Sequence, residues 1–485
     1  MILNSNRSAK TFTRGRLLAS PLVAAILMSL VFALHPSTPA FAQGVDWNTR
    51  SRTLYAELVA MRTSQGQNQT PRMTQLLADR FHTGGFAAED VHILPYDDTA
   101  ALIVRYRGNN ASGKRPILLL AHMDVVDALA SDWSLEPFML TEREGYFYGR
   151  GTVDSKVGVV ALTTAFLRFR AEGFVPGRDL IIAFTGDEET NNNGARALVK
   201  EWRNLADCEF ALNSDMGGGQ FTPDGKLVGF SLQTSEKTYA TFTLTIHNRG
   251  RRSSQPRADN AVYEMAAALS RIAAYRFAPQ INDTTQAYFE AYARKSPAPL
   301  ANAMRRFIRN PSDRAAADAI EAAPAFIGST RTTCVATRIA GGHADNALPE
   351  TAVATINCRI FPGVSIETIQ ATLARVAANP GIEIALSPDF FPATDPSRLR
   401  EGVLKAYTNA VRARFPDAPI VPTMDVSASD GAFLRAARIP TYGVDGIWGV
   451  TPDDDRLHGR DERLRVEAFY QDMDHWRTML MELAR

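Results

Sequence analysis

The chain has 485 residues, of which 45% are hydrophobic and 22% are charged. At roughly 100–200 residues per domain, this length allows two or three domains around a large buried core. The 53 basic and 52 acidic residues almost cancel, and no segment carries a long run of like charges. The composition therefore indicates a globular protein and gives no reason to expect nucleic acid as a partner.

Residues 1–42 have the pattern of a signal peptide. A basic start is followed by an apolar stretch at residues 17–34 and by the small-x-small cleavage pattern Ala40-Phe41-Ala42. A membrane anchor is the alternative, because the apolar stretch approaches the ~18–20 residues that a span needs. Two prolines after the stretch and the cleavage pattern favour removal. We therefore expect a periplasmic or secreted protein with no stable membrane span after processing.

The mature chain begins with two helical patterns and two strand patterns, and apolar strands then alternate with helices. The expected helices are residues 48–61, 72–81, 157–170 and 195–203, and the expected strands are residues 91–94, 101–106, 117–121, 180–185 and 210–213. Continuous apolar strands separated by helices are typical of a parallel sheet that is covered on both faces. We expect residues 43–235 to form the first part of an α/β domain.

The pattern changes near residue 235. Residues 241–247 alternate strictly between apolar and polar, which predicts a half-buried antiparallel strand. Helical patterns at 261–274, 275–325 and 366–378 and strand patterns at 331–339 and 352–361 complete this region. We expect residues 236–396 to be a separate α+β domain, inserted into the first. Residues 397–485 return to the α/β pattern, with helices at 402–414, 432–437 and 467–483 and a strand at 440–444.

Acidic residues and a histidine follow three of the apolar strands directly. His122 and Asp124 follow the strand 117–121, the triplet Asp187-Glu188-Glu189 follows 180–185, and Asp215 follows 210–213. In open α/β sheets, ligands bind outside the carboxyl ends of the strands. A further carboxylate, Asp154, precedes the helix at 157–170. These side chains are expected to meet at one edge of the sheet.

Each of these residues alone has an ordinary structural explanation, but the group does not. Several crowded carboxylates repel one another, and burying each costs several kcal/mol unless a cation is present. No cluster of Lys or Arg lies nearby in the sequence. Histidine and carboxylate ligands without thiolates suit zinc, with manganese or cobalt as alternatives. One bridging carboxylate would allow two such ions, ~3.5–4 Å apart.

The sequence resembles the dinuclear zinc aminoacylase/carboxypeptidase family, which includes acetylornithine deacetylase, succinyl-diaminopimelate desuccinylase, glutamate carboxypeptidase and the carnosinases. The matching segments, in order, are LLLAHMDVV (118–126), YGRGTVDSKVG (148–158), TGDEE (185–189), NSDMGG (213–218), GGHADNALPE (341–350), SDGAFLRAARIPTYGV (429–444) and RLHGRDERL (456–464). The resemblance covers essentially the whole mature chain. It implies a zinc-peptidase-like catalytic domain with a mixed, largely parallel sheet covered by helices, and an inserted α+β lid or dimerisation domain.

The resemblance also assigns roles to seven residues. It implies that His122 and Asp215 hold one zinc ion, that Glu189 and His458 hold the other, that Asp154 bridges the two, that Asp124 supports His122, and that Glu188 is the general base. Without the resemblance, His458 reads as a surface histidine. The implied reaction is hydrolysis of a peptide or N-acyl amino-acid amide bond by a water molecule that two zinc ions activate. The alternative is a metal- or ligand-binding protein on the same fold whose catalysis is altered.

One residue departs from the family pattern. Arg252 stands where the family has a histidine that stabilises the oxyanion, and a guanidinium could bind an oxyanion or a substrate carboxylate there. The other interpretation is an exposed loop residue. Because the family histidine often reaches a partner subunit, the departure leaves monomer and homodimer both open. Asn346, in the GGHADNALPE segment, is the other candidate for holding substrate.

The three cysteines do not form a disulfide framework in a chain of this size. None has C-x-x-C spacing, which argues against a thiolate zinc site. Cys334 and Cys358 lie on two strand-like runs, so a single cross-strand bridge is one pairing that the sequence leaves open.

Overall fold

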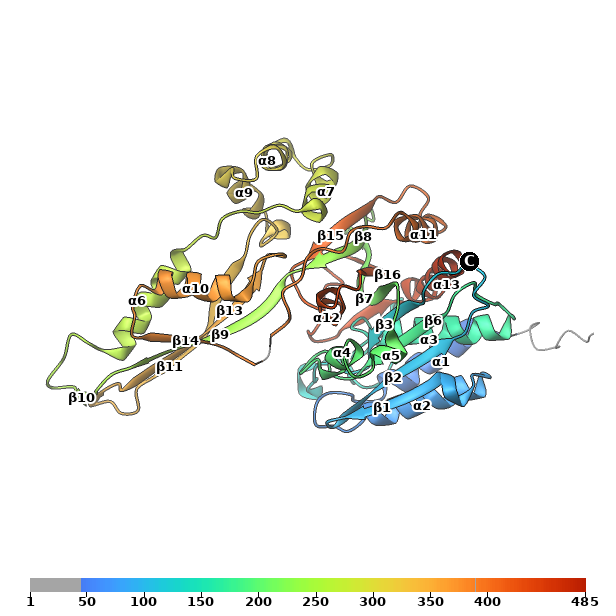
Figure 1. Cartoon of the computed structure of the whole chain (residues 1–485), viewed down its shortest axis with the longest axis horizontal. Helices are drawn as coiled ribbons and strands as arrows, with labels where there is room; N and C mark the ends of the chain where they lie inside the picture. Colours follow the sequence, from blue (N-terminus) through green and yellow to red (C-terminus); the bar gives the residue numbers. More distant parts are fainter. Residues whose placement is uncertain (1–44, 389) are drawn as a thin grey trace, which may run out of the picture. The chain divides into compact units, whose positions relative to one another are not determined.

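The computed structural model describes residues 45–388 and 390–485, and the expected signal peptide lies outside these residues. The described elements run from α1 to α13 and from β1 to β17 (Figure 1). No helix within the described part of the chain combines the length and apolarity that crossing a bilayer requires.

The larger sheet has eight strands in the order β1-β2-β6-β3-β7-β16-β8-β15. Their bounds are β1 Val91–Tyr96, β2 Thr99–Tyr106, β3 Ile117–His122, β6 Leu180–Thr185, β7 Phe210–Phe221, β8 Leu227–Glu236, β15 Ile420–Asp425 and β16 Thr441–Val450. The neighbours β6, β3, β7 and β16 are parallel, and so are β8 and β15. Antiparallel pairing joins β1 to β2, β2 to β6 and β16 to β8.

Helices cover both faces of this sheet. Five contribute to the core on one face: α1 (Trp47–Val59), α2 (Thr70–Thr83), α3 (Lys156–Ala171), α11 (Glu401–Arg412) and α13 (Val466–Leu483). Three contribute to the core on the other: α4 (Asn193–Leu198), α5 (Arg203–Ala206) and α12 (Gly431–Ala436). Along β3, Leu119 belongs to the first core and Leu118 and Leu120 to the second, as the alternation of a strand requires. The expected α/β fold with a mixed sheet is confirmed.

A second sheet has four strands in the order β11-β13-β9-β14, all antiparallel. Its strands are β9 Thr238–His247, β11 Thr333–Gly341, β13 Thr351–Ile360 and β14 Ile382–Leu386, and the helices α6 (Ala261–Ala274) and α10 (Ile366–Ala377) pack against it. Three further helices, α7 (Asp283–Tyr292), α8 (Ala298–Arg309) and α9 (Arg314–Glu321), share a small core of their own. Two short ladders complete the described strands: β10 (Arg251–Arg252) with β12 (Ala347–Leu348), and β4 (Thr141–Arg143), β5 (Tyr146–Tyr148) and β17 (Arg463–Arg465).

Several strands were not expected from the sequence. β8 ends in the buried polar run Gln233-Thr234-Ser235-Glu236, which lacks the apolar signal of a central strand. β15 contains Pro422, which argues against a central strand, but β15 lies at an edge of its sheet, where proline is tolerated. The single helix expected at 195–203 is instead the two short helices α4 and α5.

Cys334 and Cys358 form a disulfide between β11 and β13, where the two residues are direct cross-strand partners. Cys208 is free and buried in the core beside α4 and α5. The pairing that the sequence left open is therefore present in the structure.

The core beneath the larger sheet predicts where truncation is most damaging. Phe166 on α3 is fully buried and lies against Phe86 and Tyr106, with ring centroids 6.2 and 5.6 Å away. We expect Phe166→Ala to lower the free energy of unfolding by about 3–5 kcal/mol, because it removes buried contacts and leaves a cavity. Tyr263 on α6 is 71% exposed, so Tyr263→Ala should change it by less than about 0.5 kcal/mol. Urea unfolding of both variants checks this, and equal losses would contradict it.

Candidate metal centre

The parallel strands at the centre of the larger sheet bring the acidic residues together at the carboxyl ends of the strands. β3 lies between β6 and β7, and Leu120 of β3 pairs with Asn213 of β7 and with Ala183 of β6. His122 is the last residue of β3, and Asp215 lies within β7, two residues beyond Asn213. The side chains that follow these strands therefore converge at their carboxyl ends.

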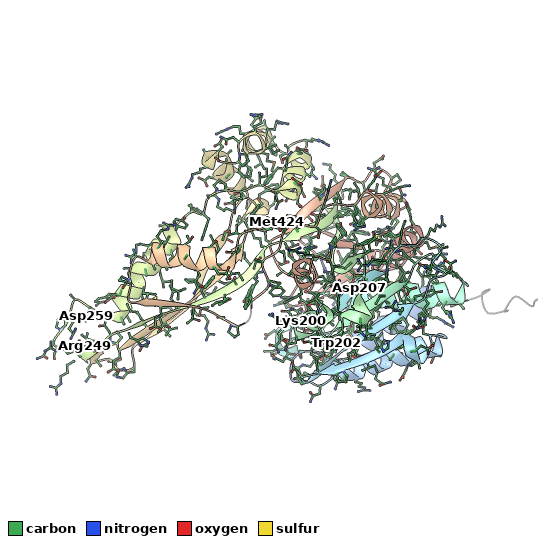
Figure 2. All side chains as sticks on the ribbon, in the orientation of Figure 1. Lys200, Trp202, Asp207, Arg249, Asp259 and Met424 are labelled. Carbon is green, nitrogen blue, oxygen red and sulfur yellow. A yellow bond between two sulfur atoms is a disulfide. The ribbon has the colours of Figure 1, made fainter. Side chains whose placement is uncertain are left out.

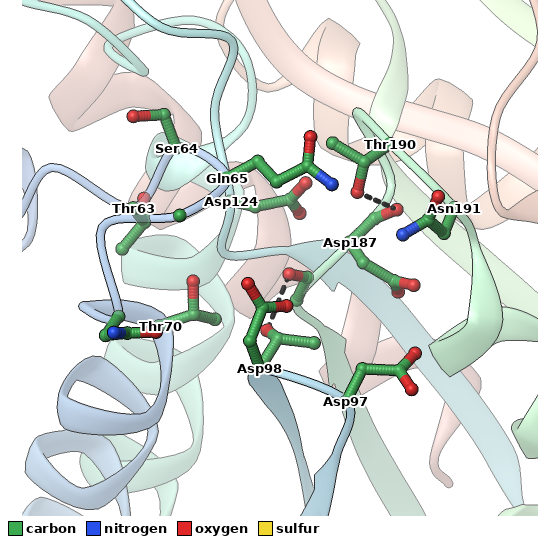
Figure 3. A pocket seen from close by; sticks show the side chains of 14 residues that line it. Thr63, Ser64, Gln65, Thr70, Asp97, Asp98, Asp124, Asp187, Thr190 and Asn191 are labelled. Carbon is green, nitrogen blue, oxygen red and sulfur yellow. Dashed lines mark hydrogen bonds between the residues drawn. The ribbon is translucent and has the colours of Figure 1, made fainter.

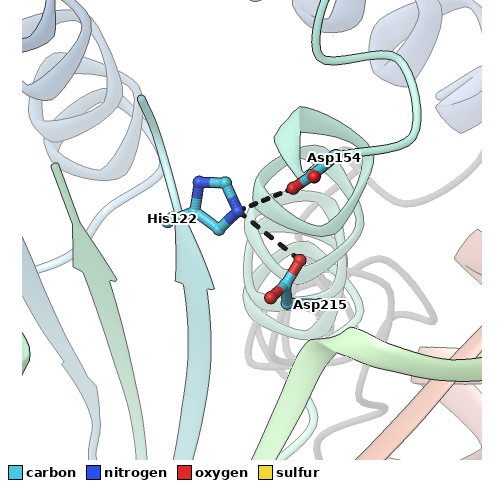
Figure 4. Close-up of side chains that lie close together, drawn as sticks. All are labelled: His122, Asp154 and Asp215. Carbon is cyan, nitrogen blue, oxygen red and sulfur yellow. Dashed lines mark hydrogen bonds and ion pairs between the residues drawn. The ribbon is translucent and has the colours of Figure 1, made fainter. Parts of the chain in front are cut away.

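His122 faces two carboxylates (Figure 4). Its Nε2 lies 2.9 Å from Oδ1 of Asp154 and 3.5 Å from Oδ1 of Asp215. The His122 side chain is only 2% exposed, and the strand that carries it is buried along its whole length. Its position is thus fixed by the sheet.

Asp154 joins this group to a second one. Its other oxygen, Oδ2, lies 2.9 Å from Nε2 of His458, which is also 3.1 Å from Oε1 of Glu189. His458 is half exposed, in the loop between β16 and β17. The two groups therefore share Asp154, with one oxygen facing each histidine, which is the arrangement that a bridging carboxylate needs.

Asp124 holds the turn that carries Glu188 and Glu189. Its two carboxylate oxygens accept the backbone N–H groups of Glu188 and Glu189, at 3.1 and 3.0 Å. Nδ1 of His122 lies 3.1 Å from the backbone oxygen of Asp124 and 3.5 Å from its Oδ1. The backbone oxygen is therefore the nearer partner of the imidazole, and the carboxylate that sequence reasoning paired with His122 mainly orients the glutamates.

The same turn is anchored from behind by Asp187. Its carboxylate accepts hydrogen bonds from the Tyr96 hydroxyl at 2.7 Å and from the backbone of Gly194 at 3.0 Å. Asp187 and Asp124 line a small polar cavity of about 20 Å³, enough for about one water molecule (Figure 3). None of the five expected metal ligands lines this cavity, so it is distinct from the metal centre.

A buried ion pair fixes the two loops that carry Asp154 and His458. Nη1 of Arg150 lies 2.6 Å from Oε2 of Glu462, and both side chains are at most 3% exposed. The Glu462 carboxylate also accepts the backbone N–H groups of Val153 and Asp154, at 2.7 and 3.2 Å. Arg150 donates to the backbone oxygen of His458 at 3.3 Å. Sequence reasoning missed both residues, although both lie inside segments that matched the family.

Burial and mutual repulsion raise the pKa of three carboxyl groups in the cluster. Burial raises the pKa of Glu188 well above its usual range. The charge of His122 lowers this pKa, but the neighbouring carboxylates of Asp215 and Glu189 raise it further. Burial likewise raises the pKa of Asp215 and of Glu189. The described residues include no Lys or Arg ion-paired to these three groups.

The histidines carry the compensating charge. Hydrogen bonds to Asp154 and Glu189 raise the pKa of His458 to about 10. Burial opposes the charged form of His122, but Asp215 and the hydrogen bonds to Asp124 and Asp154 outweigh it and raise its pKa well above the usual value. Burial would raise the pKa of Asp154, but hydrogen bonds to the two histidines hold it below the usual range. Without a cation, the cluster would have to bind protons at nitrogens that are otherwise metal ligands.

The donor atoms fit divalent ions. Ligand atoms of His122, Asp154 and Asp215 lie within 4.8 Å of one another, and so do those of Asp154, Glu189 and His458. A third such group contains His122, Glu188 and Glu189. Two nitrogens and several carboxylate oxygens, without thiolate, suit zinc, manganese or cobalt. The residues expected to bind metal from sequence and resemblance thus lie together, although His122 and His458 are 336 positions apart in the sequence.

The cluster opens onto a cavity of about 950 Å³. One part of its wall is the metal cluster itself, with Asp154, Glu188, Glu189, Asp215 and His458. Another part comes from the strands β9 and β13 and the chain that follows β14: Tyr239, Arg359, Phe390 and Phe391. A second arginine, Arg196, also lines the cavity, which therefore combines carboxylates, two guanidinium groups and aromatic rings.

The two expected substrate-binding residues lie elsewhere. Arg252 on β10 is exposed, and the backbone N–H of Ser253 donates to the oxygen of Asn346 at 2.9 Å. Arg252 and Asn346 line one open pocket together, and no residue of the metal cluster contributes to it. Figure 2 labels Arg249 and Asp259, which lie on either side of β10 in the sequence. Within one chain, the structure brings Arg252 and Asn346 to each other and not to the metal centre.

Comparisons with known proteins agree with this geometry. The model of Peptidase family M20/M25/M40 matches residues 118–482. The N-fatty-acyl-amino acid synthase/hydrolase PM20D1 of Xenopus tropicalis is 28% identical over 364 residues, covering 73% of this chain and 69% of the relative. The probable carboxypeptidase S-like 2 of Dictyostelium discoideum is 27% identical over 386 residues, covering 78% and 73%.

A solved structure has the same fold. The M20 family metallo-carboxypeptidase Sso-CP2 from Sulfolobus solfataricus superposes with a TM-score of 0.69 at 15% identity, covering 89% of this chain and 98% of that one. The family match spans about three quarters of the sequence. The chain therefore belongs to Peptidase family M20/M25/M40 and is a metal-dependent hydrolase of amide or peptide bonds.

Proposed function

We propose that this protein hydrolyses the amide bond of N-acyl amino acids or small peptides that carry a free carboxylate, with two zinc ions at the site. The observation that carries the proposal is the shared carboxylate of Asp154, whose two oxygens face His122 and His458 separately. His122 and Asp215 would hold one ion and Glu189 and His458 the other. When bound, such a pair polarises the scissile carbonyl and lowers the pKa of a water molecule toward ~7.

Glu188 is the general base in this proposal. Its carboxylate lies among the ligands, with an oxygen in one group with atoms of His122 and Glu189. No hydrogen bond from another described residue occupies that carboxylate, whereas the backbone of Glu188 is held by Asp124. A base in this position can take a proton from water and pass it to the departing amine, as general acid–base catalysis requires.

Arg359 is the proposed anchor for the substrate carboxylate. It lies on β13, lines the cavity, and stacks over the ring of Tyr239 at 4.7 Å from its centroid. Burial lowers its pKa, and among the described residues no carboxylate forms an ion pair with it. The charge of Asp425, which lines the same cavity, partly opposes this effect of burial. A partly buried guanidinium that no described carboxylate contacts directly is suited to bidentate binding of a carboxylate.

The apolar part of the cavity supports an acyl or apolar side chain on the substrate. Phe390, Phe391, Met216, Ile447 and Leu457 line it, and Leu457 is 52% exposed there. Apolar walls with a few polar groups are typical of small-molecule sites. The relatives named for N-fatty-acyl-amino acids and for carboxypeptidase activity differ in their substrates. N-acyl amino acids and the substrates of a carboxypeptidase both carry a carboxylate near the amide bond. Arg359 in the cavity wall is placed to bind such a carboxylate.

The disulfide supports export, because such bonds persist mainly in oxidising compartments. We propose a periplasmic or secreted location after removal of residues 1–42. For the mature chain we propose a catalytic domain of residues 43–235 and 397–485, with residues 236–396 as an inserted domain. Monomer and homodimer both remain compatible with this proposal.

Metal removal tests the cofactor. We expect close to two zinc ions per purified chain, loss of hydrolysis after dialysis against a chelator, and recovery when zinc is restored. Asp154→Asn should lower the metal content, because one carboxylate oxygen facing the histidines is replaced by an amide donor. Elemental analysis and a hydrolysis assay with N-acyl amino acids and dipeptides measure both. A wild-type chain without metal, or with full activity after chelation, would contradict the proposal and favour a binding protein.

Replacement of the base tests catalysis. Glu188→Gln keeps the shape of the side chain but cannot accept the proton, so turnover should fall about 10²–10⁴-fold with metal content unchanged. Glu201→Gln, at an exposed position, is the matched control and should have wild-type turnover. Near-normal turnover of a fully metallated Glu188→Gln enzyme would exclude this role.

Replacement of the anchor tests the substrate class. Arg359→Met removes the proposed charge-assisted hydrogen bonds to the substrate carboxylate, which would contribute about 1.5–3 kcal/mol to binding. We therefore expect kcat/KM for N-acyl amino acids to fall about 10–150-fold. Arg338→Met, at an exposed position of the neighbouring strand β11, is the control. The same substrates with their carboxylate converted to an amide should be cleaved poorly by wild type and equally poorly by Arg359→Met. If Arg359→Met lowered kcat/KM by the same factor for substrates with a carboxylate and for substrates with an amide in its place, the proposed anchoring would be disproved.

A further inference from the structure

A buried ion pair lies where the chain leaves the larger sheet for the smaller one. Glu236 is the last residue of β8 and precedes β9 by a single residue. Its carboxylate contacts Nη1 of Arg435 on α12, and both side chains are at most 2% exposed. Arg435 also donates to the backbone oxygen of Thr441 at 2.9 Å and to Oε1 of Gln233 at 2.7 Å. The exit from the larger sheet is therefore fixed to α12.

The returning chain is held by the same arginine. Ser397 donates its backbone N–H to the oxygen of Thr234 on β8 at 2.8 Å. Its hydroxyl accepts hydrogen bonds from Nε of Arg435 at 3.3 Å and from the backbone of Thr441 at 2.9 Å. Both places at which the chain crosses between the two sheets thus meet at Arg435.

From Glu236, hydrogen bonds continue to a predicted metal ligand. The Ser429 hydroxyl donates to Oε2 of Glu236 at 2.9 Å, and Nδ2 of Asn213 lies 3.3 Å from the Ser429 oxygen. Oδ1 of Asn213 accepts the backbone N–H of Asp215 at 3.1 Å. Ser429 and Asn213 are both at most 1% exposed, so water does not compete for these bonds.

The charge of Glu236 gives the chain of bonds a direction. A carboxylate only accepts, so the Ser429 hydroxyl must point its hydrogen at Glu236. Its oxygen is then free to accept from Asn213, and it also accepts from the backbone of Gly431 at 3.2 Å. The backbone N–H of Asp215 can only donate, so the amide of Asn213 turns its oxygen to Asp215 and its nitrogen to Ser429. The carboxylate of Glu236 and the backbone N–H of Asp215 thus fix the two ends of this chain of bonds.

We infer that Glu236, Ser429 and Asn213 form a positioning relay that holds the backbone of Asp215 in place and links it to both chain crossings. The inference rests on the proposed function, because Asp215 is one of the proposed zinc ligands. The three residues touch neither substrate nor metal in this assignment. They act through Asp215, as groups behind a metal ligand commonly do, and loss of such groups typically costs about 10–100-fold in metal affinity or activity.

Two single variants and their combination test the relay. Ser429→Ala and Asn213→Ala remove small groups from successive links, and each should weaken binding of one of the two zinc ions about 10-fold or more, measured by competition with a chromophoric chelator. Because the links act in series, the double variant should lose no more than the larger single loss. Ser231→Ala, on the same strand β8 as Glu236 but outside the relay, should bind zinc like wild type.

The thermal midpoint of the metal-free protein, read together with the affinities of the two zinc ions, separates positioning from general stability. Ser429→Ala also leaves buried hydrogen-bonding groups unpaired, so its midpoint should fall below that of Ser231→Ala, but only one of the two zinc ions should bind more weakly, with kcat lowered and KM little changed. Wild-type zinc affinity in Ser429→Ala, additive losses in the double variant, or equal weakening of both ions together with a lowered midpoint would overturn the relay. A wild-type chain that binds no zinc would overturn the proposed function as well, whereas the first three results would leave that function intact.

Discussion

Repulsion among carboxylates at one edge of a sheet is the constraint on which the rest of this structure depends. Asp154, Glu188, Glu189 and Asp215 lie close together, and among the described residues the imidazoles of His122 and His458 are the cationic groups in contact with them. In a partly buried site, like charges at such distances raise one another's pKa and destabilise the folded state unless protons or cations bind. Divalent ions satisfy the oxygens and nitrogens together, whereas protons would block the nitrogens. Metal binding is therefore what allows this cluster to form, and the catalytic chemistry depends on it.

A cluster of this kind needs a framework that keeps its members from moving apart. The framework consists of other buried polar groups: Asp124 holds the turn of the two glutamates, and Glu462 with Arg150 holds the loops of Asp154 and His458. A buried ion pair adds little net stability compared with an apolar pair of the same volume, but removal of one partner leaves a charge unpaired. The value of the pair at this site is geometric, since it joins segments 312 positions apart.

Sequence reasoning succeeded where a local pattern carried the information. The apolar runs before His122 and before the two glutamates predict strands, and parallel strands end along one edge, so their meeting follows from the order of the chain. His458 required the family resemblance, because an exposed loop histidine has no local signal. Glu462 was missed because its partner is distant in sequence, and β8 because Gln233 and its neighbours are polar yet buried. The sequence left Arg252 open as a group at the substrate or an exposed loop residue, and in one chain it is exposed and lines a different pocket.

The two sheets divide the chemistry between them. The strands of the larger sheet and the loops beside them supply the groups that would hold metal or move a proton, and buried strands and the Arg150–Glu462 ion pair fix these groups. Tyr239 and Arg359, which would recognise the substrate, come from β9 and β13 of the smaller sheet. In the proposed function, substitutions at these positions of the smaller sheet would change which amide is cleaved and leave the metal ligands in place. At Glu236 the chain leaves the larger sheet for the smaller one, and the polar residues that weaken the strand signal of β8 make the buried hydrogen bonds of this junction.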